Sequence, residues 1–477
     1  MVALPFSASR VSFGFRESVQ AFLGRPDLPF AAQLDPNQIR EVFSKHNALF
    51  GGLYTTAIVL WAFMGQVLSD GKEASCQSAV AKISAYFARL GRKAPRADTG
   101  AYCRARIMLP EAALRELSHL VAKGAQEQYD VAKKWKNRNV YLVDGFTFQM
   151  PDTPSNQRTY PQHSAQKSGL GFPIARVVAL ISLATGCVVD LALGPYKGKA
   201  TGESALFRSL LHHLQPGDVV VADRHYCSYA MVCDLMKRGV HVCFRQHQAR
   251  HIDFRKGKRL GKYDHVVAWS RGPRPAWMTK EDYDKLPMAI VLREVRYVIE
   301  EPGRKQEPFI VVTTLLEPME DAGATKDELA SLYGFRWNVE LDIRSIKPNM
   351  NLGHLRCKSP EMVHREFWIS ILAYNLIRTT TAIAAKLHQR EPRHLSFTSA
   401  CQYVLAGWQE IQRKSTADEL RAYCLTILER ISECVVANRP GRFEPRVVKR
   451  RRDQYTLMME PRSELRKRLA RGDNAFE

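Results

Sequence analysis

Two hydrophobic periodicities divide the chain into a helical and a strand-rich part. Residues 1–135 carry apolar side chains at helical spacing, as in SAVAKISAYFARL (78–90) and PEAALRELSHLVAKGAQEQY (110–129). From about residue 138 the period shortens, and three β-rich runs follow between turn residues: NVYLVDGFTFQM (139–150), RVVALISLATG (176–186) and CVVDLALGP (187–195). We therefore expect a helical N-terminal region at 1–135 and an α/β region after it.

The order of the later runs predicts an interrupted α/β core. Helical ALFRSLLHHL (205–214) precedes strand-like GDVVVAD (217–223), and a helix over 224–239 precedes VHVCFRQ (240–246). Residues 247–318 are again strand-rich, and helices return at 325–385. We interpret 136–246 as the first part of the core, 247–318 as a β-rich insertion and 319–385 as the second part. A helical, basic C-terminal region at 386–477 follows, for dimerisation or DNA contact.

Three features bear on the compartment. Residues 47–69 carry no charge, but two adjacent glycines, two threonines and a glutamine interrupt the apolar run, which predicts a buried helix rather than a membrane span. The first residues lack the basic, apolar and cleavage segments of a signal peptide, so we expect a cytoplasmic, nucleoid-associated protein. The ten cysteines form no CxxC pair or metal-finger spacing, and we interpret them as reduced core thiols.

The charge of the chain predicts a polyanionic partner. Seventy Lys and Arg residues against 48 Asp and Glu give a net charge of +22, which favours nucleic acid, with an acidic membrane surface as the rival. Seven cations surround a Gly/Pro turn between two predicted helices, at Lys82, Arg89, Arg92, Lys93, Arg96, Arg104 and Arg106. Residues 439–477 add 12 basic residues against 6 acidic ones. Either group could contact DNA phosphates or form a solvated basic surface.

Candidate acids stand at the ends of apolar strands. Asp144 ends VYLVD and Asp223 ends VVVAD, where a rigid scaffold would hold each carboxylate, although such residues are often ordinary turn residues. The weaker candidates are Asp152 in a loop, Asp190 facing out of a hairpin strand, Asp218 in a turn, and Glu203 at the start of a helix, where the dipole favours a carboxylate.

One polar stripe marks the stretch LYGFRWNVELDIRSIKPN (332–349). On a helix, Tyr333, Arg336, Glu340, Arg344 and Lys347 fall within an arc of roughly 80°. Phe335, Val339 and Ile346 share another face, Asp342 points away, and Pro348 should end the helix near Lys347. The alternative is a solvated face with ion pairs from Glu340 to the arginines four residues before and after it.

Three acids from separated segments suggest metal-dependent chemistry. Asp144, Asp223 and Glu340 offer the hard oxygen ligands that a pair of divalent ions requires. Bound cations would also offset the repulsion between these carboxylates and a DNA phosphate. Arg336 and Lys347 could then grip the phosphates that flank the cut.

These residues resemble a known family. The spacing Tyr333-x2-Arg336-x3-Glu340-x6-Lys347 is similar to the signature of the insertion-sequence-four family of bacterial DDE transposases. The segments LVDG, VVADRHY, IVVTTLLEP, LGHLRCKSPE and ILAYNLIR follow the family's order, so the resemblance covers roughly residues 70–385. His225 in DRHY departs from the smaller or acidic residue expected there, and we interpret it as packing on Tyr226.

The resemblance implies a fold and a reaction. The fold would be a ribonuclease-H-like mixed-sheet core, and Asp144, Asp223 and Glu340 would bind two Mg²⁺ or Mn²⁺ ions. The enzyme would bind terminal inverted repeats, cut the ends through a DNA hairpin and join them to target DNA, as a homodimer. Tyr333, Arg336, Arg344 and Lys347 would bind DNA.

A flipped base would need an aromatic platform, and the candidates are Trp269, Trp277 and Trp337. The alternatives to a transposase are a domesticated DNA-binding regulator and a ribonuclease-H-like nuclease without strand transfer.

Overall fold

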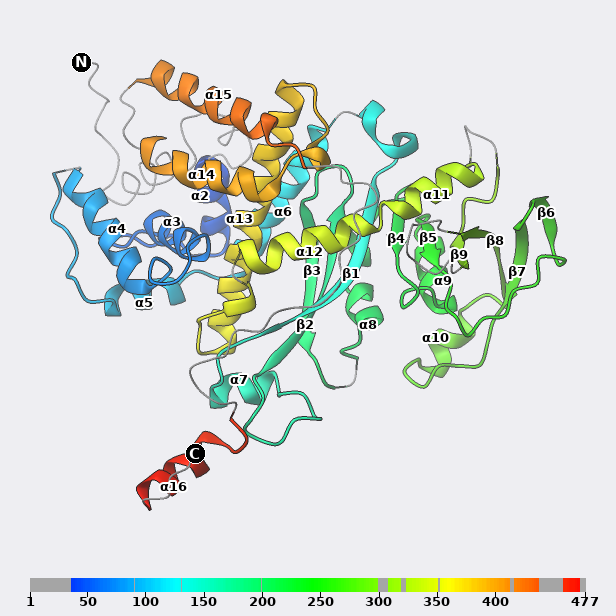
Figure 1. The fold of residues 1–477 in the computed structure, drawn as a ribbon, viewed down its shortest axis with the longest axis horizontal. Coiled ribbons are helices and arrows are strands. Elements are labelled where there is room, and N and C mark those ends of the chain that lie inside the picture. The colour runs from blue at the N-terminus through cyan, green and yellow to red at the C-terminus, as the bar shows by residue number, and fades with distance from the viewer. Residues whose placement is uncertain are drawn as a thin grey trace.

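The computed structural model describes residues 36–89, 91–129, 131–198, 200–298, 308–318, 323–350, 352–411, 416–436 and 458–471. The start of the chain and the basic segment VVKRRRDQY (447–455), for which the sequence suggested DNA contact, lie outside these ranges. Figure 1 shows the N-terminal helices at one end, a long sheet through the middle, and the last strands of that sheet at the other end.

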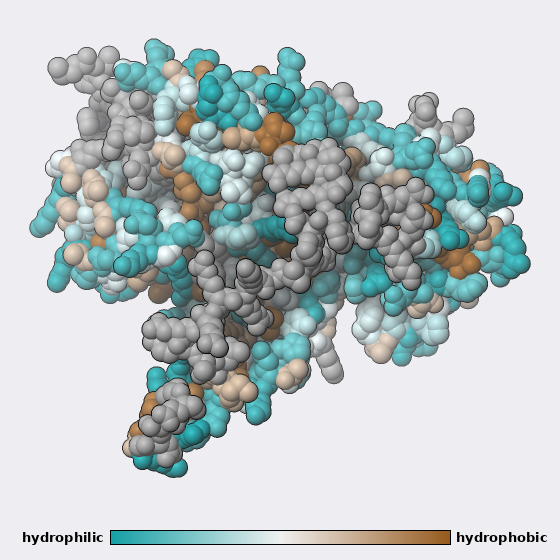
Figure 2. All heavy atoms as spheres, in the orientation of Figure 1, coloured by the Kyte–Doolittle hydropathy of each residue, from teal (hydrophilic) through white to brown (hydrophobic). Residues whose placement is uncertain are grey.

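The N-terminal region is helical, as the periodicity predicts. Its helices are α2 (Pro36–Lys45), α3 (Thr56–Val67), α4 (Cys76–Arg89), α5 (Gly100–Ile107) and α6 (Glu111–Glu127). Nearly every residue of α3 is buried, which confirms a buried helix within 47–69. Among the described residues no helix is both long and apolar enough to cross a bilayer. The surface in Figure 2 is mostly hydrophilic where it is coloured, and its hydrophobic areas are scattered.

The basic cluster between α4 and α5 does not lie on one surface. Arg106 is packed inside the helical region, with its guanidinium 4.7 Å from the Phe63 ring and a hydrogen bond of 3.2 Å to Gln66. Arg92 stacks on Phe87, with 4.9 Å between guanidinium and ring centroid, and Arg96 is almost fully exposed. The prediction of a shared DNA-contacting surface is therefore wrong for Arg106, because the nearby aromatic rings draw its side chain inward.

A nine-stranded sheet forms the centre, in the order β3-β2-β1-β4-β5-β9-β8-β7-β6. The strands are β1 (Val140–Gln149), β2 (Ile174–Ser182), β3 (Val188–Pro195), β4 (Val219–Ala222), β5 (His241–Arg245), β6 (Lys258–Gly261), β7 (Asp264–Ser270), β8 (Ala289–Val298) and β9 (Pro308–Thr313). Strands β1 to β3 are antiparallel neighbours, and β4 and β5 continue parallel to β1. This arrangement confirms the ribonuclease-H-like mixed sheet.

The predicted β-rich insertion extends the core sheet instead of forming a separate one. Strand β9 pairs with β5, and β8, β7 and β6 follow outward. A buried ion pair of 2.6 Å between Arg293 and Asp264 joins β8 to β7. Trp269 is also buried there, and its indole N–H donates to Glu294 at 2.7 Å. Trp269 is therefore a core residue and no platform for a flipped base. The domain boundaries drawn from the sequence remain predictions.

Helices cover both faces of the sheet. The helices after the first strand are α7 (Pro154–Thr159), α8 (Glu203–Arg208), α9 (Tyr229–Lys237), α10 (Lys280–Asp284), α11 (Lys326–Gly334), α12 (Trp337–Asn349), α13 (Pro360–Leu387), α14 (Phe397–Ile411), α15 (Ala417–Glu433) and α16 (Arg462–Ala470). Because side chains alternate along β1, Leu142 and Phe146 pack with α12 and α13, whereas Tyr141 and Val143 pack with α8 and α9. Seven of the ten cysteines are buried, as expected for core thiols, and none of the ten, all of which the structure describes, forms a disulfide bond.

Candidate active site

The parallel pairing of β1 with β4 places the two aspartates side by side. Its last pair is Val143 with Ala222, and Asp144 and Asp223 follow directly on the two strands. Asp223 leaves the sheet at the end of β4, as predicted. Asp144 lies inside β1, which continues to Gln149, so the prediction of a strand end was wrong for this residue. β1 continues because β2 still pairs with it beyond the point where β4 stops.

The next strand adds a cation to this row. Phe244 of β5 pairs with Ala222, so Arg245 follows on β5 as Asp223 follows on β4. Since the carboxyl ends of parallel strands share one edge of a sheet, the pairing aligns Asp144, Asp223 and Arg245 along that edge.

Helix α12 brings Glu340 over the two aspartates. α12 packs on β1, and its residues Val339 and Ile346 are fully buried. The burial of these two side chains fixes the rotation of the helix about its axis. Arg336 donates from Nη2 to Glu340 Oε1 at 2.7 Å, which confirms the first expected ion pair. Arg344 is exposed and lines neither of the two cavities described below. Of the two arginines, Arg336 is therefore the one that lies beside Glu340 at the cavity.

The polar stripe lies on two helices instead of one. α11 ends at Gly334 and α12 begins at Trp337, which leaves Tyr333 on the first helix. Phe335, at the break, is exposed and does not share the buried face of α12. The second helix includes Pro348 and ends at Asn349, two residues after Lys347, near which its end was predicted. Asp342 points away, as predicted, and is buried.

Two cavities meet at the acids. The first cavity, of about 460 Å³, is lined by Asp144, Asp223, Arg224, His225, Arg245, Tyr333, Arg336 and Glu340. Burial raises the pKa of Tyr333 to about 12, so its hydroxyl keeps its proton at neutral pH. The ring of His225 lies 2.9 Å from Asp223 Oδ2, and this hydrogen bond raises the pKa of the histidine. His225, which we interpreted from the sequence as packing on Tyr226, thus also bonds to Asp223 and lines the first cavity.

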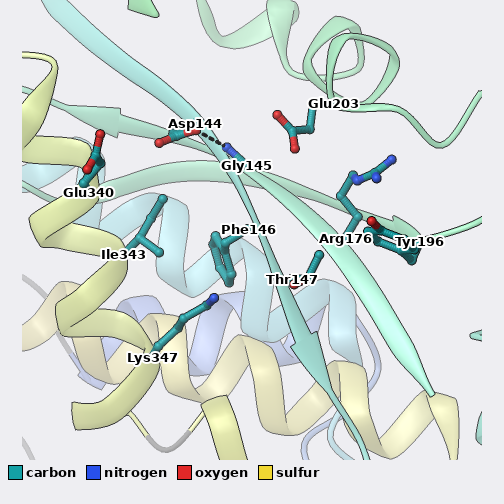
Figure 3. Close-up of a pocket in the computed structure, with 10 residues that line it drawn as sticks. All are labelled: Asp144, Gly145, Phe146, Thr147, Arg176, Tyr196, Glu203, Glu340, Ile343 and Lys347. Atoms are coloured by element: carbon teal, nitrogen blue, oxygen red, sulfur yellow. Dashed lines mark hydrogen bonds between the residues drawn. The ribbon is translucent and has the colours of Figure 1, made fainter. Parts of the chain in front are cut away.

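The second cavity lies along β1 on the other side of the same acids. Its volume is about 510 Å³, and its lining consists of Asp144, Gly145, Phe146, Thr147, Arg176, Tyr196, Glu203, Glu340, Ile343 and Lys347. In Figure 3, Glu340 and Lys347 extend from α12, and Glu203 lies on the other side of β1. Lys347 therefore lines a different cavity from Tyr333 and Arg336, although the sequence placed all three within one arc of a helix.

Asp144 is the most strongly perturbed acid of the site. Burial, opposed by a 2.8 Å hydrogen bond from the Gly145 N–H, raises its pKa to about 6, and the neighbouring Asp223 contributes in the same direction. Burial also lowers the pKa of Lys347. Because the charge of Asp223 disfavours ionisation of Asp144, a bound cation would stabilise the charged form of Asp144.

Glu203 approaches β1 where the chain has a glycine. It begins α8 after Gly202, as predicted. A Cβ atom at Gly145 would lie 2.4 Å from Glu203 Cδ, so only glycine permits this approach. Tyr226 donates to Glu203 Oε2 at 3.4 Å. Glu203 is therefore the third carboxylate that borders the second cavity, with Asp144 and Glu340.

The other candidate acids serve local structure. Asp218 accepts from the Gln215 N–H at 2.7 Å in a turn, and Asp152 accepts from Gln157 at 2.8 Å. Asp190, expected to face outward, is fully buried. It forms ion pairs with Arg115, His119 and His213. Burial opposes ionisation of Asp190, but these hydrogen bonds hold its pKa well below the usual range.

His119, Asp190 and His213 also form a group of potential metal ligands. Among the described residues, this is the group whose ligand atoms all lie within 4.8 Å of one another. The Arg115 guanidinium donates twice to the same carboxylate and would compete with a cation. We therefore infer that this cluster holds α6 against β3. It could not be recognised in the sequence, because its members lie far apart in the chain.

The oxygen-only donor set of Asp144, Asp223 and Glu340 fits a hard divalent cation such as Mg²⁺ or Mn²⁺. Their carboxylates are spread around the first cavity more widely than the ligands of the histidine group. Because one oxygen of Glu340 already accepts from Arg336, a cation would compete with this arginine or share the carboxylate with it.

Sequence reasoning missed several residues of the two cavities. Arg224 comes two residues after an apolar strand, and Arg245 ends one. Asp223 was identified by the same signal, so the sequence also indicated these two arginines. Arg176 is the one charged residue of the otherwise apolar strand β2, and a charged residue in such a strand indicates a possible site. Tyr196 follows β3, and its role depends on strand pairing that sequence alone does not provide.

The chain is similar to known transposases. Residues 135–376 match the model of a transposase DDE domain. The chain is 26% identical over 326 residues to the transposase InsG for insertion sequence element IS4 of Escherichia coli (strain K12), covering 67% of this chain and 70% of InsG. It is 24% identical over 106 residues to the putative transposase InsZ of the same organism, covering 22% of this chain and 34% of InsZ.

Among solved structures, a piggyBac transposase synaptic complex with hairpin DNA aligns over 87% of this chain and 85% of that one. The TM-score is 0.39 and the sequence identity 10%, so we draw no argument from this likeness. The matched domain spans β1 to the middle of α13 and contains all three acids of the site. The chain belongs to the DDE transposases, in the insertion-sequence-four family.

Proposed function

We propose that this transposase binds the terminal inverted repeats of its element, cuts both strands at each end and joins the freed ends to target DNA. The observation that carries the proposal is the meeting of Asp144, Asp223 and Glu340 at one cavity, beside Arg336 and Tyr333. Carboxylates and cations together suit a phosphodiester, because bound metal ions and arginine can both offset its charge.

Asp144, Asp223 and Glu340 would hold a pair of Mg²⁺ or Mn²⁺ ions, which when bound activate a nucleophile and stabilise the leaving oxygen. The protein's own part is to place the DNA. Tyr333 and Arg336 would hold a phosphate in the first cavity, and Lys347 would hold one in the second, on the other side of the acids. Arg344, exposed on α12, would contact DNA outside both cavities.

The proposed reaction begins with attack of water on the phosphodiester at the element's end, which frees a 3′-hydroxyl. That hydroxyl attacks the opposite strand and forms a hairpin, which a second water opens before the end is joined to target DNA. For a base flipped out at the hairpin, Trp337 and Trp277 remain the candidate platforms, since both are about half exposed. The guanidinium of Arg208 already covers the Trp277 ring at 3.9 Å, which favours Trp337. Two ends must be paired, so a homodimer would act, in the bacterial cytoplasm.

Purified protein and linear DNA carrying one inverted repeat with flanking sequence, incubated with Mg²⁺ or Mn²⁺, test the proposal. A denaturing gel should show nicked, hairpin and fully cut products, and added plasmid should become joined to the end. Binding without cleavage would favour a DNA-binding regulator. Cleavage without hairpin or joined product would favour a nuclease.

Loss of Arg336 or Lys347 should affect the hairpin step more than the first nick. Neither cation can be a metal ligand, and bringing a tethered 3′-hydroxyl onto the opposite strand demands tighter orientation than delivering water. We expect Arg336→Ala or Lys347→Ala to accumulate nicked DNA, with hairpin formation slowed about 10-fold more than nicking, a loss near 1.4 kcal/mol in the second barrier. A time course on the same gel measures both steps.

Tyr333→Phe serves as the mild control, because it removes one hydroxyl and no charge. Arg344→Ala is the comparison on α12: its DNA contact would lie outside both cavities, so it should slow nicking and hairpin formation equally. Equal slowing of nicking and hairpin formation in both cavity variants would contradict the assigned phosphate contacts.

A further inference from the structure

The second cavity contains an arginine that the metal chemistry does not use. Arg176 extends from β2, and its guanidinium lies 4.6 Å from the centroid of the Tyr196 ring. Its Nη1 donates to the Thr201 carbonyl at 2.9 Å, whereas its Nε is buried and has no hydrogen-bond partner among the described residues. The protein leaves this buried N–H without an acceptor, so its own groups do not fully satisfy the guanidinium.

Beyond Val143, strand β1 pairs with β2 on one edge and with no described strand on the other, and Arg176 of β2 lies opposite Thr147 on the paired edge. β4 pairs with β1 only over Val140–Val143, and β1 runs on to Gln149. Residues 144–147 of β1 all line the second cavity. In Figure 3, Arg176 and Tyr196 lie on one side of this segment and Lys347 on the other. The cavity therefore begins at the acids and continues along β1 between two cations.

The two cavities share Asp144 and Glu340 alone. Tyr333 and Arg336 belong to the first cavity, and Arg176 and Lys347 belong to the second. A DNA strand that reacts at the shared acids must extend away from them in two directions. The acid end of the second cavity, with Glu203 added, repels a bare phosphate, so an anion is best held further along, at Arg176.

We propose that the second cavity holds the DNA strand beyond the cut, with Arg176 donating to the first phosphates of the flanking DNA. The Tyr196 ring would fix the guanidinium plane, and the forked donors of arginine suit two phosphate oxygens. The inference rests on the proposed function, because it assigns the flank to one side of the cleavage site and the element's end to the other.

Binding without cleavage tests this assignment. In buffer with Ca²⁺ and no Mg²⁺, affinity is measured for two duplexes: one that ends at the cut, and one that continues ten base pairs into the flank. Arg176→Gln should weaken binding of the flanked duplex about tenfold, the effect of one charge-assisted hydrogen bond. Its affinity for the duplex that ends at the cut should stay unchanged. Arg176→Lys should restore part of the loss, since it returns the charge without the fork.

Neutral methylphosphonates at the first two flank phosphates locate the contact. They should weaken binding by the wild-type protein and have no further effect in Arg176→Gln, because the two changes remove one interaction. Lys197→Gln is the matched control, since it removes an exposed positive charge next to Tyr196 outside the cavity. Circular dichroism and thermal melting of each variant check the fold.

Two results would overturn the inference while leaving the proposed function intact. One is equal weakening of both duplexes by Arg176→Gln, or by Lys197→Gln to the same extent, which would indicate general charge attraction. The other is a methylphosphonate effect that persists in Arg176→Gln. If wild-type protein binds inverted-repeat DNA no better than random DNA, the proposed function fails and the inference fails with it.

Discussion

Asp144→Asn, Asp223→Asn and Glu340→Gln should each reduce DNA cleavage by more than about 100-fold, since loss of a partner outside the ligand shell alone costs about 10- to 100-fold in metal sites. Each change removes one charge at almost constant volume, so the folded protein should persist. Cleavage is measured on end-containing DNA with Mg²⁺, and binding by gel shift of the same DNA. Binding should remain within about threefold of wild type, because Tyr333, Arg336 and Lys347 stay in place.

Asp218→Asn is a suitable control, because that carboxylate lies in a turn and lines neither cavity. It should cleave like the wild type. Cleavage at the wild-type rate by any one of the three variants would remove that residue from the proposed metal site. A parallel loss of binding would instead indicate that the acid organises the DNA-contacting residues, and the gel shift separates the two cases.

In contrast to the three substitutions above, Asp342→Asn should cause a large loss of stability. Asp342 lies two residues from Glu340 on α12, but it is 1% exposed and receives Arg378 and Arg393 at 2.6 Å each. Removing the charge leaves two arginines without their counter-ion, and Arg378 is itself buried. Breaking a buried ion pair costs about 3–5 kcal/mol, so the midpoint of urea unfolding should fall sharply.

Glu340→Gln on the same helix is the matched comparison. Its partly exposed carboxylate has one arginine partner, so the free energy of unfolding should change by less than about 1 kcal/mol. An Asp342→Asn variant with a wild-type unfolding midpoint would show that water or a rearranged partner replaces the lost charge. The pair of variants thus separates an acid held for chemistry from one held for packing.

The sequence determined the elements and most of the chemistry. Alternating and helical periodicities located β1 to β5 and α6 because buried faces require them, and they also separated the helical front from the α/β core. Asp223 could be identified because a polar residue ending an apolar strand leaves a clear local signal. The stripe of Arg336, Glu340 and Lys347 was visible for the same reason, since helical spacing alone brings these residues near one another.

The tertiary structure decided which groups meet. Strand register placed Arg245 beside Asp223 and showed Asp144 to lie inside β1, and pairing partners are set by contacts between residues far apart in the chain. Tyr333 and Lys347 lie on different helices, because the chain breaks between α11 and α12, and they line different cavities. Local periodicity could not predict this, because a helix ends or turns where its neighbours in the fold require it.

The sequence also could not predict which polar residues are buried. Asp190 and Arg106 have the composition of surface residues, yet each is enclosed by partners from other segments: Asp190 by α6 and the turn after α8, and Arg106 by the rings of α3 and α5. A charge is buried only where its partners satisfy it, and those partners are assembled by the fold. The sequence therefore determined which residues could do chemistry here, and long-range packing determined which of them line the two cavities and which hold the protein together.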